Sequence, residues 1–148
     1  MSENFIDTVI IGAGIIGLAI ARKFALRNKD VLVIEEQPTF GTITSSRNSG
    51  VIHAGVYYDK GSLKSELCPK GNRLLYDYCE KRKISHINTG KFIVASSNDE
   101  SNELQKILDQ SEDSDIEGIK LVSKKYVKDK EPLIECTEAI YVPSTGIV

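Results

Sequence analysis

DTVIIGAGIIGLAIARKFALRNKDVLVIE, residues 7–35, is the stretch of sequence that decides the fold. Residues 7–11 form a short run rich in β-branched side chains without alternation, which is typical of a strand buried on both faces. Residues 15–28 carry apolar and basic side chains at helical spacing, and residues 31–34 form a second apolar run. A strand, a helix and a strand within about thirty residues have the size of a βαβ crossover. The sequence therefore predicts an α/β fold that begins as a Rossmann-like unit.

A G-x-G-x-x-G motif at Gly12, Gly14 and Gly17 stands between the first expected strand and the helix. In this context the first glycine permits a tight turn, and the second lets the backbone approach a pyrophosphate. The third glycine lets the helix pack closely on the strand, and the helix N-terminus offers N–H groups and a positive dipole end to phosphates. We expect a dinucleotide site here; the alternative is a glycine-rich turn without a ligand.

An acidic residue closes the second expected strand. Glu35 follows Gly12 by 23 residues, close to the spacing of about 20 for the carboxylate that binds the adenosine ribose. Such a carboxylate accepts hydrogen bonds from both ribose hydroxyls and repels a 2′-phosphate, which favours NAD or FAD over NADP. Glu36 is the rival, but Glu35 shares one side of the strand with Val31 and Val33 and is preferred.

A loop rich in small polar residues, 42–55, follows the second strand and should lie at the carboxyl end of the sheet, where open α/β sheets bind ligands. Its candidate donors to phosphates or a cofactor ring are Ser45, Ser46, Arg47, Asn48 and Ser49. A solvated loop without a ligand is the alternative. His53, between small and apolar residues, is a candidate general base or cofactor contact, or else a buried histidine of the core.

The rest of the chain predicts further helices and strands. Ser62 is a candidate N-cap of a helix that runs to about residue 82, and Pro69 should kink or divide it. Its expected buried face carries Leu63, Leu67, Leu74, Leu75 and Tyr78. Strands are expected at 91–95, 119–122 and 139–142, and helices at 99–110 and 123–130. We expect exposed apolar surface within 119–148, where strands without a complete sheet leave open edges.

Composition narrows the class of protein. The 148 residues carry a formal net charge of −2. This balance lacks the excess of basic residues that is typical of nucleic-acid-binding proteins. No apolar run reaches the length of about 18 residues that a membrane-spanning helix needs. Three cysteines without C-x-x-C spacing favour reduced, buried thiols over a disulfide or zinc site. We expect no metal site, and a cytoplasmic protein, with peripheral association with the inner membrane as the alternative.

Three segments carry a family resemblance: the stretch that begins at residue 7, NSGVIHAGVYY with SLKSELCPKGNRLLYDYC at 48–79, and TGKFIVA at 89–95. Together they resemble the N-terminal portion of L-2-hydroxyglutarate dehydrogenases and oxidases, in the FAD-dependent D-amino-acid oxidase superfamily. The resemblance implies FAD as cofactor, the glycine motif on its pyrophosphate, Glu35 on its ribose, and residues 45–49 along the phosphates and flavin. It places His53 beside the flavin ring, where some relatives attach FAD covalently through a histidine.

The resemblance also implies a reaction and a domain plan. A small 2-hydroxy acid, L-2-hydroxyglutarate, is oxidised to 2-oxoglutarate by hydride transfer to the flavin, and the electrons pass to oxygen or to a membrane quinone. Residues 1–90 would be the N-terminal segment of an FAD-binding domain, and residues 91–148 the incomplete start of an α+β substrate domain. Alternatives are another flavin-dependent amino-acid or glycerol-3-phosphate oxidase, a non-catalytic nucleotide-binding module, and half of a split flavoenzyme with a complementary chain.

Overall fold

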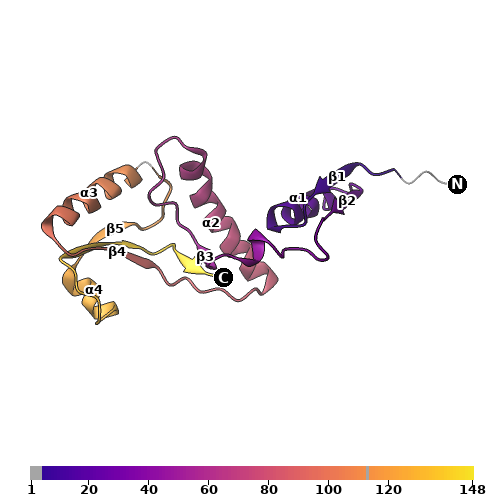
Figure 1. Cartoon of the computed structure of the whole chain (residues 1–148). Helices are drawn as coiled ribbons and strands as arrows, with labels where there is room; N and C mark the ends of the chain where they lie inside the picture. Colours follow the sequence, from indigo (N-terminus) through magenta and orange to yellow (C-terminus); the bar gives the residue numbers. More distant parts are fainter. Residues whose placement is uncertain (1–4, 113) are drawn as a thin grey trace. The chain divides into compact units, whose positions relative to one another are not determined.

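The computed structural model describes residues 5–112 and 114–148. The chain packs as two compact units, Met1–Ser49 and Gly50–Val148. Figure 1 shows the order of their helices and strands along the chain. The predicted boundary near residue 90 concerns which part contacts cofactor and which contacts substrate. It stays a prediction, because the packing division reflects contacts within the chain alone.

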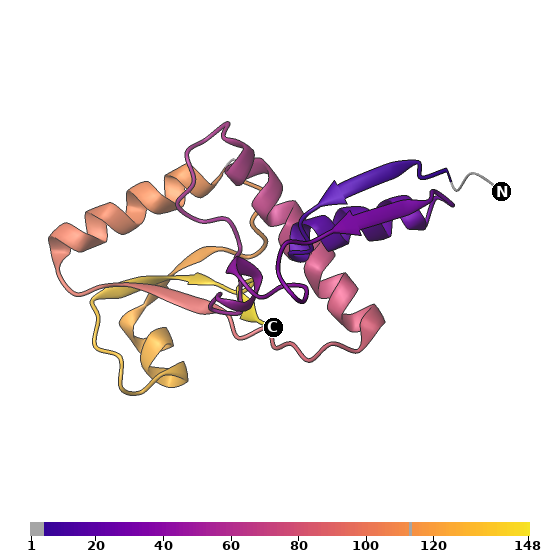
Figure 2. The ribbon, with the colours of Figure 1, turned by 45° about the vertical axis from the view of Figure 1, so that its right-hand side comes forward.

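The first unit is the expected βαβ crossover. It consists of β1 (Thr8–Ile11), α1 (Ile15–Ala25) and β2 (Val31–Ile34), with the two strands parallel and side by side (Figure 2). Their register pairs Thr8 with Val31 and continues to the pair Ile11 and Ile34. Helix α1 ends three residues before the expected position, since Asn28 takes a left-handed backbone conformation with φ 56°.

The two strands of this unit are covered on one face only. Thr8, Ile10, Val31 and Val33 are half-buried, whereas the alternate side chains of both strands are exposed. The expectation of burial on both faces is therefore wrong for this chain. The physical reason is that α1 is the helix of this unit that packs on the pair, and one helix covers one face of a parallel sheet.

The second unit is built on a three-stranded antiparallel sheet. Its strands are β4 (Lys91–Ala95), β5 (Lys120–Ser123) and β6 (Glu138–Val142), with β6 in the middle. Helix α3 (Asn98–Glu112) and helix α4 (Lys124–Lys130) pack on opposite faces of this sheet (Figure 1). The alternation of β6 produces this arrangement, because Ile140 and Val142 join the cluster with α3 while Ala139 joins the cluster with α4.

All three predicted strands and both predicted helices of this region are confirmed; β4 has the predicted ends, and the ends of the others differ by at most two residues. Ser123 caps α4, and its Oγ accepts a hydrogen bond from the Tyr126 backbone N–H. The central strand is fully buried at Ile140 and Val142. Exposed apolar side chains remain in 119–148 at Leu121, Leu133, Ile147 and Val148, as expected.

Helix α2 (Leu63–Arg82) follows its predicted cap but buries a different face. Ser62 Oγ accepts from the Ser65 N–H at 3.1 Å, which confirms the N-cap. Pro69 does not divide the helix in two. The predicted apolar face is wrong: its side chains Leu63, Leu67, Leu74 and Tyr78 are exposed, and Pro69, Asn72 and Cys79 are the buried residues. Packing and hydrogen bonds to the loops, described below, select this face.

A short pairing that the sequence did not predict joins the two ends of the second unit. Strand β3 (Val51–Ile52) pairs antiparallel with β7 (Gly146–Ile147). The Val148 N–H also donates to the Gly50 carbonyl at 2.8 Å. A strand of two residues is too short to show an alternating pattern, so nothing in the loop sequence 40–58 predicted β3.

Candidate functional site

The candidate dinucleotide site is a cavity of about 300 Å³ in the first unit. Its lining residues come from the glycine turn, the end of β2 and the following loop: Gly12, Gly14, Glu35, Gly41, Thr42, Ile43, Thr44 and Ser45. Three segments of the first unit therefore meet where β1 and β2 end. This is the edge of the sheet at which α/β folds bind ligands.

The glycine turn has the conformation that its motif predicts. Gly12 has φ +100°, which side chains rarely adopt, and open space lies where its Cβ would stand. A Cβ on Gly14 would come within 3.1 Å of Ser45 Oγ. A Cβ on Gly17 would lie only 2.0 Å from the Gly12 carbonyl oxygen, so α1 approaches the turn more closely than an alanine permits. The turn thus lets a ligand approach the main chain closely, as binding of a pyrophosphate requires.

Glu35 ties β2 to the glycine turn. Its Oε2 accepts a hydrogen bond from the Ala13 N–H at 2.6 Å, and its Oε1 accepts from the Gln37 N–H at 2.9 Å. The hydrogen bonds from the Gln37 and Ala13 N–H groups lower the pKa of the Glu35 carboxyl, so it is ionised at neutral pH. A carboxylate has about four acceptor positions, so capacity remains for a ribose hydroxyl.

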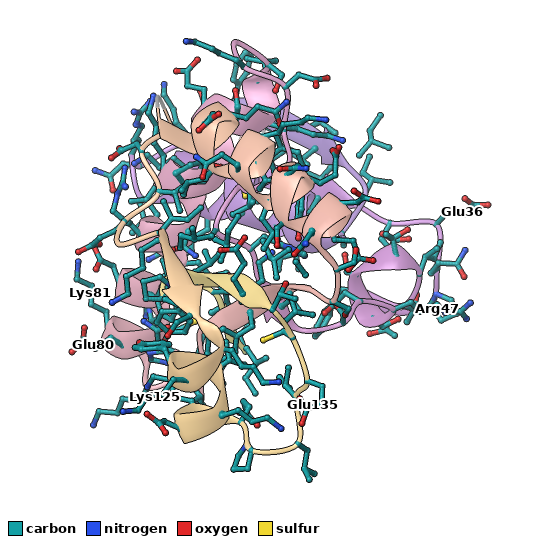
Figure 3. All side chains as sticks on the ribbon, turned by 90° about the vertical axis from the view of Figure 1, so that its left-hand side faces the viewer. Glu36, Arg47, Glu80, Lys81, Lys125 and Glu135 are labelled. Carbon is teal, nitrogen blue, oxygen red and sulfur yellow. The ribbon has the colours of Figure 1, made fainter. Side chains whose placement is uncertain are left out.

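Glu36, the rival acid, does not line the cavity. Its side chain is exposed and extends away from the ribbon of its own unit (Figure 3). The alternation along β2 accounts for the difference, because Glu35 continues the half-buried positions Val31 and Val33 and Glu36 falls on the other side. The preference for Glu35 therefore agrees with the geometry.

The polar loop contributes one of its five expected side chains to the cavity, and Arg47 is exposed outside the lining. Ser45 lines it, and its Oγ accepts from the Ile15 N–H at 2.9 Å, at the N-terminus of α1. Ser46 Oγ donates to the Thr42 and Ile43 carbonyls, and Asn48 Nδ2 donates to the Ser45 carbonyl. These two side chains shape the loop from within. Ser49 is exposed and outside the cavity lining.

The structure adds backbone and hydroxyl groups that sequence reasoning did not single out. The Gly41 N–H donates to the Ala13 carbonyl at 3.0 Å and holds the loop against the glycine turn. Thr42 and Thr44 line the cavity beside Ser45. The small polar composition of residues 42–55 was the available signal, but it does not say which hydroxyl faces inward.

His53 belongs to the second unit, in the segment after β3. Its side chain is exposed, so it is not a core histidine. Its carbonyl accepts from Asn72 Nδ2 at 3.1 Å and from Cys68 Sγ at 3.6 Å, and Asn72 also donates to the Ser144 carbonyl at 2.8 Å. The buried amide of Asn72 thus fixes the backbone of His53, while the imidazole is open to a ligand.

The described residues, 5–112 and 114–148, hold neither a metal cluster nor a membrane-spanning helix. They contain no group of three or more histidine, cysteine, aspartate or glutamate side chains placed to hold a metal ion. No helix in this part of the chain is long and apolar enough to cross a bilayer. Cys79 and Cys136 are buried free thiols and Cys68 is a partly buried one.

The turn, the acid on β2 and the N-terminus of α1 define a dinucleotide-binding βαβ unit of the kind found in oxidoreductases. The sequence model of the FAD-dependent oxidoreductase family matches residues 7–148. The chain belongs to that family. The predicted cofactor, FAD, is the one that the family's description names.

Curated relatives refine the comparison. The chain is 41% identical over its whole length to an L-2-hydroxyglutarate dehydrogenase of Arabidopsis thaliana, of which it covers 31%. It is 40% identical to the enzymes of that name from Dictyostelium discoideum and Homo sapiens, over 96% and 99% of the chain and 33% and 32% of those proteins. All three are named as mitochondrial. The predicted resemblance is confirmed, and the chain spans about a third of the length of these relatives.

Solved structures share the fold. An L-α-glycerophosphate oxidase from Mycoplasma pneumoniae, with FAD bound, matches with a TM-score of 0.83 at 23% identity, over 96% of this chain and 38% of that one. A glycine oxidase from Geobacillus kaustophilus matches with a TM-score of 0.80 at 24% identity, over 96% and 40%. At these identities the likeness confirms the α/β flavoenzyme fold and says nothing of substrate.

Proposed function

We propose that the protein carrying this chain is an FAD-dependent enzyme that oxidises L-2-hydroxyglutarate to 2-oxoglutarate. One observation carries the choice of substrate: the chain is about 40% identical, over almost its whole length, to enzymes named for that activity. The solved amino-acid and glycerophosphate oxidases are less than 25% identical and support only the fold. A small 2-hydroxy acid is therefore the proposed partner.

The cavity of the first unit is the proposed site of the adenosine diphosphate part of FAD. Gly12, Gly14 and the N-terminus of α1 would hold the pyrophosphate, because the turn lets the ligand approach the backbone and the helix end favours anions. Glu35 would accept hydrogen bonds from the ribose hydroxyls. Gly17 would act indirectly, by letting α1 stand close to the turn.

The loop after β2 has two proposed roles toward the cofactor. Ser45 lines the cavity and would donate its hydroxyl hydrogen to a phosphate while it caps α1. Ser46, Asn48 and Ser49 are proposed contacts along the phosphates and flavin. For Ser46 and Asn48 the observed hydrogen bonds within the loop support a shaping role at the same time.

Oxidation of a 2-hydroxy acid removes a hydride from the α-carbon and a proton from the hydroxyl group. Bound FAD supplies the hydride acceptor. His53 is the proposed residue that orients the hydroxyl or takes its proton, and its exposed imidazole on a fixed backbone supports this role. The electrons then leave to oxygen or to a membrane quinone, which are the two proposed acceptors.

The test uses the intact enzyme with its flavin bound. Under anaerobic conditions, L-2-hydroxyglutarate should bleach the flavin absorbance and yield one 2-oxoglutarate per flavin. The D-enantiomer, glycine and glycerol 3-phosphate are the matched controls. If only glycine or glycerol 3-phosphate reduces the flavin, that compound replaces L-2-hydroxyglutarate as the proposed substrate. If the protein takes up no flavin, the result favours a non-catalytic nucleotide-binding module.

His53 is tested in the same enzyme. His53→Ala should lower turnover by about a hundredfold, the lower end of what general acid–base catalysis contributes, while the flavin content stays at that of the parent. Unchanged turnover in this variant would remove the proposed role. The compartment also stays a proposal: the cytoplasm is expected for this chain, although its named relatives are mitochondrial, and fractionation of cells decides between them.

A further inference from the structure

Lys91 opens strand β4 in the second unit and is only partly exposed. Its backbone pairs with Val142 of the central strand β6, which fixes where the side chain begins. Its Nζ lies 4.9 Å from the centroid of the Tyr57 ring, the distance of a cation–π contact. The ammonium is therefore held in one place by a strand at its base and a ring at its tip.

The charge of Lys91 is not neutralised by the side chains that the structure describes. No carboxylate among them lies within 4.0 Å of its Nζ, whereas Lys70 pairs with Glu66, and Lys124 and Lys128 pair with the two carboxylate oxygens of Glu135. Partial burial lowers the pKa of Lys91, since desolvation disfavours the charged form. The ammonium is thus partly desolvated and available to an anionic ligand group.

The residue whose ring contacts Lys91, Tyr57, has a strained backbone conformation. Tyr57 has φ +79°, a left-handed backbone that is unusual for a bulky aromatic residue. The residue before it, Val56, is 5% exposed and belongs to the main hydrophobic cluster, which anchors the segment. Strained backbone of this kind persists only where the surroundings impose it, and it is concentrated at ligand sites.

The same segment carries His53, four residues before Tyr57. Cys68 of α2 connects the two positions: its Sγ donates to the His53 carbonyl at 3.6 Å, and the Lys91 ammonium opposes the rise that burial causes in the pKa of its thiol. Lys91 therefore lies at one end of the segment 53–57, beside Tyr57, and His53 lies at the other. All of these contacts lie within the second unit.

We propose that Lys91, positioned by Tyr57, binds a carboxylate group of the substrate while His53 meets its hydroxyl group. The inference rests on the proposed function for the identity of the substrate, but it requires only that the ligand be a small carboxylic acid. The ammonium donates hydrogen bonds to the carboxylate oxygens, and its restraint by the ring reduces the entropy lost on binding.

The experiment measures binding of glutarate, a dicarboxylic acid without a hydroxyl group to oxidise, to the intact flavin-loaded enzyme by calorimetry. Lys91→Met keeps the apolar stem on the Tyr57 ring and removes the charge, and it should raise the Kd for glutarate at least tenfold. Lys91→Arg keeps the charge and should recover most of the affinity. Lys120→Met is the matched control, because Lys120 lies 5.2 Å over the Tyr126 ring but is exposed on β5.

Kinetics then separate binding from folding. Lys91→Met should raise KM for L-2-hydroxyglutarate more than it lowers kcat, at unchanged flavin content and thermal midpoint; Lys91→Gln replaces it if the methionine variant does not fold. L-2-hydroxypentanoate, which has only the α-carboxylate, identifies which carboxylate Lys91 binds. If Lys91 binds the α-carboxylate, Lys91→Met raises KM for both substrates. If Lys91 binds the distal carboxylate, the variant raises KM for L-2-hydroxyglutarate alone.

Two results would overturn the inference: no detectable binding of glutarate by the parent, or a Kd in Lys91→Met within twofold of the parent and of Lys120→Met. A parent that binds glutarate through Lys91 but does not oxidise L-2-hydroxyglutarate would remove the proposed function and leave the carboxylate site. A parent enzyme that oxidises L-2-hydroxyglutarate equally well without Lys91 would support the proposed function and remove the carboxylate site.

Discussion

Replacing Gly17 with alanine tests the contact between α1 and the glycine turn. The new Cβ would stand 2.0 Å from the Gly12 carbonyl oxygen, 3.2 Å from the Gly12 carbonyl carbon and 3.5 Å from Ile10 Cγ2. Real Cβ contacts are essentially never shorter than 3.0 Å. Helix α1 must therefore recede from the turn by about 1 Å, which moves the N–H groups at the helix N-terminus away from the cavity.

The magnitude follows from two opposing effects. Overpacking of this kind costs about 1–3 kcal/mol, and alanine in place of glycine in a helix returns about 1 kcal/mol. The net loss is up to about 2 kcal/mol, which corresponds to a factor of up to about 30 in an equilibrium constant. We expect Gly17→Ala to raise the Kd for FAD by about tenfold and to release the flavin at a lower temperature.

Gly71→Ala is the matched control. Gly71 lies in the interior of α2, and a Cβ there would meet nothing within 4 Å. The same substitution should therefore stabilise α2 by about 0.5–1 kcal/mol and leave the Kd for FAD unchanged. Flavin fluorescence during heating and FAD titration of the apoprotein measure both variants. A Gly17→Ala variant that binds FAD as tightly as the parent would refute the steric argument.

Three further predictions concern charge, capping and packing. Glu35→Gln should weaken FAD binding. Because the Glu35 pKa is lowered in the folded chain, the carboxylate's contribution to FAD binding is complete above pH 4.5 and is lost as pH falls through the depressed pKa. FAD titration at several pH values should show that the variant lacks this loss of affinity in acid. Ser62→Ala should cost about 1 kcal/mol of α2 stability in denaturant unfolding, since it removes the acceptor for Ser65, and Ser62→Asp should retain it. Ile140→Ala should cost about 2–5 kcal/mol at a fully buried position, whereas Leu133→Ala, at a side chain 96% exposed, should stay within about 0.5 kcal/mol of the parent; equal effects would contradict the burial of the central strand.

Much of the fold could be predicted because its signals are local. The strand at 31–34 and the strand at 91–95 have the predicted ends, and the caps at Ser62 and Ser123 mark where α2 and α4 begin. Periodicity, capping and glycine spacing each involve residues within one or two turns of each other.

Local signals do not predict which face of helix α2 is buried. Its leucines are spaced as a buried face, yet the structure buries Pro69, Asn72 and Cys79 instead. Asn72 is polar and gives no hydrophobic signal, but its amide satisfies the carbonyls of His53 and Ser144, 19 and 72 residues away. Buried polar groups require such partners, and a sequence pattern does not contain them.

The candidate site divides in the same way. The sequence by itself determined the dinucleotide unit: the glycine turn, the helix that follows and the choice of Glu35 over Glu36, because each depends on spacing along a single βαβ crossover. Only the tertiary structure decided that Ser45 lines the cavity while Ser46 and Asn48 bond within the loop. Only the tertiary structure also brought Lys91 over Tyr57 and beside Cys68. Side chains from a strand, a loop and a helix meet there because the loop packs against the sheet at Val56 and bonds to α2 through the His53 carbonyl. Contacts between such distant segments leave no period or motif in the chain.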